Sequence, residues 1–295
     1  MKATVVLFPQ GIIDKPFLVK ARQWAGEVTE KTSSRTAPAL ISIYLWEKER
    51  DFQEFDAREK AELGVVSGGD SDFLATHEAW RGYPRIHLAL AKIQGIPGAV
   101  VRGVVQHEIA HALLHGRPEF YQFRFADRLM EAGRSAGLDF PMIQQWVYLL
   151  SLAIKDEEAV RLLGEAGLGL YQIRLLEYLM EDTEEERRAW DLIRDHPALR
   201  RLGLAAFLKI RLPIETLSGL GLPESGLLQE KWEAAYAWLT DQGEKTLNAY
   251  VRTVRETPSK NFQDRLEKAA LGLINHSVFE FNLLNPAPLS PNGSP

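Results

Sequence analysis

The segment from residue 104 to residue 116 constrains the fold most strongly, because it places five polar side chains, His107, Glu108 and His111 among them, inside a long apolar helical pattern. His107 and His111 are four residues apart, so both lie on one face of a helix. Glu108 has only Val, Ala and His three and four positions away, so no basic residue on this helix can pair with it. Burying these three groups is costly, whereas a bound divalent cation makes the same group favourable. The pattern therefore predicts a metal site with His107 and His111 as ligands.

The chemistry of these residue types indicates zinc. Two neutral imidazoles and a carboxylate bind Zn²⁺ at about 2.0–2.2 Å and leave a fourth position for water. Zinc lowers the pKa of such a water toward about 7, and Glu108 is placed to take its proton. The chain contains no Cys, so thiolate ligands and disulfides are excluded. We expect one Zn²⁺ per chain, with manganese and iron as alternatives because the same donors suit several divalent ions.

Three acidic residues on the helical segment 141–163 differ in their helical neighbours. Asp156 has only apolar residues three and four positions away, so its side chain is expected to point into the core. Glu157 has Arg161 among its helical neighbours and ranks second. Glu158 has two basic residues within reach and is expected to form surface ion pairs. Of the three carboxylates, that of Asp156 is therefore the one most expected to point inward, followed by that of Glu157.

His115 extends the run of histidines, but it lies about 12 Å along the helix axis from His107. One ion cannot contact both side chains. The next residue, Gly116, is typical of a helix C-terminal cap. We expect His115 to end the helix or to line a cleft.

The sequence His107-Glu108-Ile109-Ala110-His111, preceded by a strand candidate, resembles the active-site segment of the zincin metallopeptidases. The similarity covers about residues 40–164. In the gluzincin branch of this superfamily the third ligand is a carboxylate on a downstream helix, so this gluzincin-like resemblance implies Asp156 as the third ligand, with Glu157 as the alternative. Asp156 differs from the Glu typical of gluzincins, and the subfamily is not identified.

This resemblance implies a zinc-dependent metallopeptidase that acts on a peptide or protein substrate, with Glu108 as the general base. It also implies that the strand at the active-site cleft binds the extended substrate, and we expect residues 85–91 to be that edge strand. The alternative is a metal-containing zincin-fold protein that binds or regulates without cleaving. A third interpretation is a helical scaffold in which the motif is accidental.

The organisation along the chain indicates an α+β fold. Strands are predicted at residues 5–8, 40–46 and 85–91, helices at 15–30 and 51–63, and a loop at 67–72. From residue 99 onward the helical period dominates, and we expect helices at 99–115, 141–163, 170–179, 184–195, 202–212, 227–253 and 261–275.

We interpret residues 1–135 as a zincin-like catalytic half with a small mixed sheet. Residues 136–284 form a helical half that contributes the third metal ligand. Residues 285–295 carry Asn, Pro, Ser and Gly with few large apolar groups, and are expected to be a flexible tail.

Composition limits the partners. The net charge is −5, which gives no electrostatic reason to bind nucleic acid or an anionic membrane. The apolar run at residues 147–154 is far shorter than the roughly 18–20 residues that cross a bilayer. The N-terminal apolar run, residues 4–8, is shorter than the core of a secretory signal. A cytoplasmic protein is predicted, and its oligomeric state is left open.

Other polar residues carry weaker signals. His77 has no His four residues later, so it starts no second metal motif. His87 alternates with Ile86 and Leu88 along a predicted strand, and we expect it on the surface, opposite the core. Tyr121 and Tyr148 are candidates to stabilise an oxyanion, but packing aromatics are the default interpretation of both.

Overall fold

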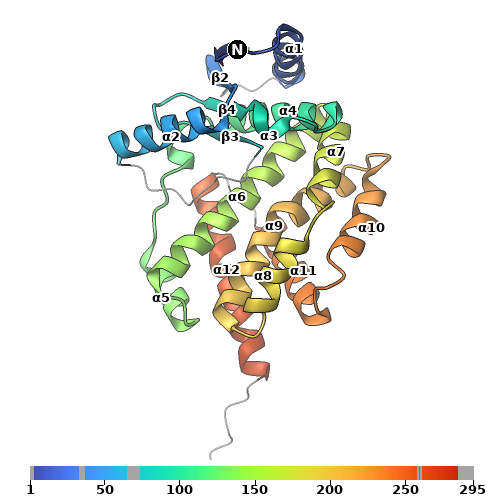
Figure 1. Ribbon diagram of the computed structural model, residues 1–295. Helices are drawn as coiled ribbons and strands as arrows, with labels where there is room; N and C mark the ends of the chain where they lie inside the picture. The colour runs from blue at the N-terminus through green and yellow to red at the C-terminus, as the bar shows by residue number, and fades with distance from the viewer. Residues whose placement is uncertain (1–2, 33–36, 65–73, 258, 260, 285–295) are drawn as a thin grey trace, which may run out of the picture. The chain divides into compact units, whose positions relative to one another are not determined.

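A computed structural model describes residues 3–32, 37–64, 74–257, 259 and 261–284. These residues form four β-strands, twelve α-helices and one short 3-10 helix, so the fold is α+β and mostly helical, as expected (Figure 1). The predicted loop at 67–72 and the predicted tail at 285–295 lie outside the described residues.

The chain divides into two compact units, each assembled from separate stretches. Unit 1 consists of Met1–Gln122, Lys155–Thr183 and Ile210–Trp238. Unit 2 consists of Phe123–Ile154, Glu184–Lys209 and Leu239–Pro295. The two units therefore interleave along the chain, and the division into consecutive halves at residue 135 stays a prediction.

The sheet of unit 1 is small and mixed. Its strands are β1 (Thr4–Gln10), β2 (Leu40–Trp46), β3 (Ala75–Glu78) and β4 (Arg85–Ala89), in the order β1-β2-β4-β3. β1, β2 and β4 are parallel, and β3 is antiparallel to β4. The three predicted strands are confirmed, although β4 ends at Ala89 because the chain turns into α3 (Leu90–Ile93).

The expectation that residues 85–91 form the edge strand is wrong. β4 lies between β2 and β3, and the edge strand beside it is β3. β3 was not predicted, because four residues that include His77 and Glu78 show no apolar alternation.

Side chains of the inner strands alternate between two covered faces. Ile41, Ile43 and Leu45 of β2 share one face with Ile86 and Leu88 of β4, and all five are buried. They belong to a core that also contains apolar residues of α1 (Lys15–Lys31) and α4 (Gly98–His115). This face therefore packs against the helix that carries the histidines.

The opposite face of the sheet is covered by α2 (Glu49–Leu63). His87 stacks on Tyr44 and on Phe52 of α2, with ring centroids 5.2 Å apart in both pairs. The side chain of His87 is 3% exposed. The expectation of a surface His87 is wrong because α2 covers this face too, as is usual for parallel strands.

A buried ion-pair network lies on the same side of the sheet. The Arg85 guanidinium donates to Glu59 of α2 and to Glu78 of β3, and all three residues are buried. The hydrogen bond from Arg85 outweighs the effect of burial and lowers the pKa of Glu59. The network therefore fastens the edge strand β3 to its neighbour β4 and to α2.

Helix α4 has buried apolar residues on every side, which is the pattern of a helix surrounded by other elements. On the side away from the sheet it packs against α7 (Gly169–Leu179). Gly103 allows the close approach, because a Cβ at this position would overlap the Tyr171 carbonyl oxygen and lie 3.2 Å from Leu175 Cβ.

The remaining helices largely follow the predicted segments. They are α5 (Asp127–Ser135), α6 (Phe140–Glu165), α8 (Glu184–Ile193), α9 (Pro197–Gly219), α10 (Ser225–Ala235), α11 (Asp241–Arg255) and α12 (Phe262–Leu284). α5 was not predicted, and α9 is longer than the predicted 202–212 and contains Pro213.

The single helix predicted at 227–253 is two helices. The interruption is explained by Thr240, whose extended backbone and side-chain oxygen cap α11 by accepting from the Gly243 N–H. Among the residues that the structure describes, none of the helices is long and apolar enough to cross a membrane.

We expect Gly103→Ala to lower the free energy of unfolding by about 1–3 kcal/mol, because the added methyl group forces α7 away from α4. Gly26→Ala in α1 is the matched control: its Cβ would meet nothing within 4 Å, so it should be stabilising by about 0.5–1 kcal/mol. Urea unfolding followed by circular dichroism measures both. A Gly103→Ala protein as stable as the control would contradict the packing argument.

Candidate metal centre

Three potential ligand atoms converge within unit 1. His111 Nε2 lies 2.9 Å from His107 Nε2 and 3.0 Å from Asp156 Oδ1, and His107 Nε2 lies 3.4 Å from the same oxygen. His107 and His111 come from successive turns of α4, and Asp156 comes from α6. Three atoms bound at about 2.0–2.1 Å to a tetrahedral ion lie about 3.3 Å apart. The spacing of these three atoms therefore suits one small cation, and we call His107, His111 and Asp156 the triad.

The orientation of His107 is fixed from α7. His107 Nδ1 lies 3.0 Å from Gln172 Oε1, and the Gln172 amide donates in turn to the Gly103 carbonyl at 3.1 Å. An amide oxygen only accepts, so Nδ1 of His107 carries the hydrogen. Nε2 is then left with a lone pair directed at the other triad atoms, which is the tautomer that a metal ligand requires.

The orientation of His111 is fixed by His115. His115 Nε2 lies 2.9 Å from Glu158 Oε2, so it donates to that carboxylate. His115 Nδ1 is then an acceptor for His111 Nδ1–H at 3.2 Å. His111 Nε2 keeps its lone pair for the triad. His115 thus lies outside the triad and supports one of its members, while Glu158, expected in surface ion pairs, contacts a buried imidazole.

Of the three acidic neighbours on α6, Asp156 is the one that lies next to the imidazoles of His107 and His111. Glu157 is fully buried, pairs with Arg161 and accepts a hydrogen bond of 3.2 Å from Thr216 Oγ1. Burial opposes ionisation of Asp156, but the proximity of the His107 and His111 imidazoles outweighs it and holds the pKa of Asp156 well below its usual range. Asp156 is therefore an anion beside two imidazoles, a donor set that fits a divalent cation.

Glu108 lies beside the triad on α4 and is 8% exposed. Burial raises the pKa of Glu108 to about 7. Its Oε2 lies 2.8 Å from Nδ1 of His77 on β3. The His77 ring also stacks on that of His111, with centroids 4.1 Å apart and planes 8° from parallel. Burial, with Lys155 nearby, lowers the pKa of His77 to about 3, so this imidazole is neutral at pH 7.

His77 and Gln172 were not identified from the sequence. His77 lies 31 positions before Glu108, and Gln172 lies 65 positions after His107, so no local spacing relates either residue to the motif. Their contacts arise only when β3 and α7 pack on α4.

Tyr121 and Lys155 border the same region. The Tyr121 ring lies 6.0 Å from that of His77, centroid to centroid, and Lys155 Nζ lies 4.4 Å from the Tyr121 ring. Burial raises the pKa of Tyr121 and lowers the pKa of Lys155 to about 8. Tyr121, one of the two candidate oxyanion stabilisers, therefore lies next to His77. Tyr148, the other candidate, belongs to unit 2.

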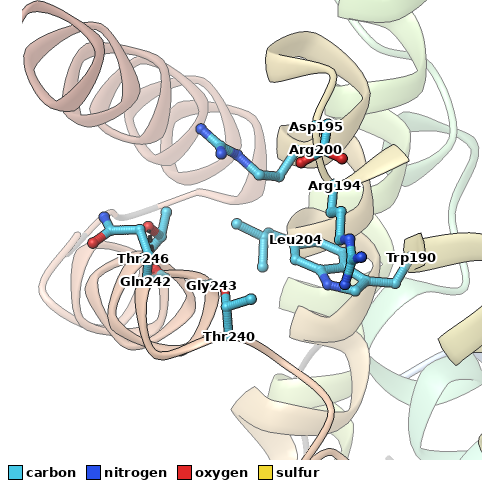
Figure 2. Close-up of a pocket in the computed structure, with 9 residues that line it drawn as sticks. All are labelled: Trp190, Arg194, Asp195, Arg200, Leu204, Thr240, Gln242, Gly243 and Thr246. Carbon is cyan, nitrogen blue, oxygen red and sulfur yellow. Dashed lines mark hydrogen bonds between the residues drawn. The ribbon is translucent and has the colours of Figure 1, made fainter. Parts of the chain in front are cut away.

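Unit 2 contains a pocket of about 260 Å³ (Figure 2). It is lined by Trp190, Arg194, Asp195, Arg200, Leu204, Thr240, Gln242, Gly243 and Thr246. None of these nine residues is His, Glu or Cys, so the pocket offers neither the imidazoles nor the buried glutamate found on α4. The α4 site is accordingly the candidate functional site.

Comparison of the chain with protein-family models, with curated proteins and with solved structures found no match.

The triad predicts about one zinc per chain in wild-type protein, with loss of zinc in His111→Ala and in Asp156→Ala. Plasma mass spectrometry of dialysed protein measures this. His196→Ala, which removes an exposed histidine of unit 2, and Glu157→Gln are the controls and should keep the metal. Zinc retained by Asp156→Ala would contradict the assignment of the third ligand.

Removing the Gln172 side chain, which orients His107, should weaken zinc binding without abolishing it. We expect Gln172→Leu to raise the zinc dissociation constant about 10–100-fold, since partners that orient a ligating His typically contribute this much. Competition with a zinc chelator measures the constant. Gln53→Leu, at an exposed position of α2, should bind zinc as the wild type does. Equal affinity in all three proteins would show that Gln172 does not orient His107.

Proposed function

We propose that this protein is a zinc-dependent metallopeptidase. The observation that carries the proposal is the convergence of His107, His111 and Asp156 next to a buried Glu108 on the same helix. The donor set of two imidazoles and one carboxylate leaves a position open for water or substrate. The resemblance of the segment 107–111 to zincins supports the same reaction.

When bound, zinc supplies Lewis acidity, which lowers the pKa of a water and polarises a carbonyl oxygen. Glu108 accepts the proton of the attacking water and then donates it to the departing amine. Gln172 and His115 keep the Nε2 lone pairs of the two ligating imidazoles directed at the cation. Asp156 supplies negative charge that offsets that of the cation.

The position of β3 supports a peptide or protein substrate. An extended peptide can add to the free edge of a sheet through backbone hydrogen bonds. β3 is the edge strand, and its residue His77 contacts Glu108. We therefore assign the role of the substrate-binding strand to β3 and expect a peptide or protein substrate.

One observation favours a second candidate function. Glu108 already has a partner in His77, and the side chain of His111 is only 3% exposed. A site so enclosed also suits a zincin-fold protein that holds zinc and binds a peptide without cleaving it. Peptide binding without turnover by the zinc-loaded wild type would support this alternative.

The test of the peptidase is Glu108→Gln, which keeps the shape of the side chain and removes the base. We expect turnover of a peptide library to fall by about 10²–10⁴-fold with zinc content unchanged. Glu131→Gln, at an exposed position of α5, is the control and should cleave like the wild type. Cleavage is read by mass spectrometry. A Glu108→Gln protein that retains full activity would refute the mechanism.

A further inference from the structure

The edge strand β3 is held from both of its faces. His77 pairs with Ile86 of β4 and points to the α4 side, whereas Glu78 pairs with Arg85 and points to the α2 side. Glu78 also accepts a hydrogen bond of 3.0 Å from the Trp80 N–H. The pairing of β3 with β4 is thus supported by contacts of Glu78 that lie outside the triad.

The imidazole of His77 reaches the candidate base directly. Its Nδ1 lies 2.8 Å from Glu108 Oε2, and its ring lies parallel to that of His111 at 4.1 Å. A glutamate side chain has three rotatable bonds, so a carboxylate on a helix takes several orientations unless a donor selects one. The bond from His77 occupies Oε2 and leaves Oε1 as the oxygen that accepts a proton.

We propose that His77 is a positioning residue that donates Nδ1–H to Glu108 Oε2 and fixes the carboxylate in the orientation in which Oε1 acts as the base. The inference rests on the proposed function and adds to it a residue from outside the helix motif. His77 is not one of the ligands, because the nitrogen facing α4 is engaged by Glu108.

The proposed role requires a hydrogen bond from the Nδ1 position of His77 to Glu108. Three variants separate this hydrogen bond from the stacking of the ring on His111. His77→Phe keeps a flat ring to stack on His111 and removes both nitrogens. His77→Asn places an amide N–H near the position of Nδ1, whereas His77→Gln places it near that of Nε2. Only His77→Asn should retain the bond to Glu108.

The probe is acetohydroxamate, which chelates zinc and needs a correctly placed carboxylate to take up its proton. Isothermal titration calorimetry on zinc-loaded protein gives its dissociation constant. We expect the constant to rise about 10–100-fold in His77→Phe and in His77→Gln, and to stay within about threefold of the wild type in His77→Asn. Zinc content should be the same in all four proteins. For any peptide that the wild type cleaves, kcat should fall in His77→Phe while KM is unchanged.

The outcomes distinguish the two proposals. Wild-type affinity for acetohydroxamate in zinc-loaded His77→Phe would overturn the role of His77 and leave the peptidase proposal standing. The expected hydroxamate pattern without cleavage of any peptide would support the role of His77 and overturn the peptidase. A wild type that binds no zinc would overturn both. If circular dichroism shows that His77→Phe is unfolded, the comparison of His77→Asn with His77→Gln decides.

Discussion

The structure of unit 1 depends on the burial of imidazoles and carboxylates along one apolar helix. Each polar atom that is taken out of water needs a hydrogen-bond partner or a cation, because an unsatisfied buried group costs about 1–3 kcal/mol. The partners for α4 come from separate elements: Gln172 from α7, Glu158 and Asp156 from α6, and His77 from β3. The requirement to satisfy α4 therefore determines which elements surround it and how closely they approach.

Local patterns predicted most of the secondary structure. β2 was predicted with its observed bounds because 40–46 is a run of β-branched and aromatic residues, and α4 was predicted within one residue. The failures have tertiary causes. β3 is held by polar contacts instead of an apolar face, and His87 is buried because α2 covers a side of the sheet that strand alternation alone leaves open. The break between α10 and α11 depends on a cap that an apolar periodicity does not register.

The residues of the candidate site that follow from helical spacing could be predicted from the sequence. The spacing of His107 and His111 follows from the helical repeat, and the apolar neighbours of Asp156 indicated that its carboxylate points inward. The supporting residues could not be found in this way. Gln172 reaches His107 because Gly103 lets two helices approach closely, and a single glycine in a helix does not reveal which partner it admits.

The opposite placement of His77 and Glu78 has a consequence for how the sheet assembles. Successive side chains on a strand point to opposite faces, so a slip of β3 by one residue would exchange the two. Arg85 would lose one of its two carboxylates, and Glu78 would meet Glu108, another acidic group, in place of an imidazole donor. The shifted pairing of β3 would thus be destabilised electrostatically on both faces of the strand. β3 has only four residues, too few for hydrophobic matching to set its register. The register is instead set by charge, through the same side chains that surround α4.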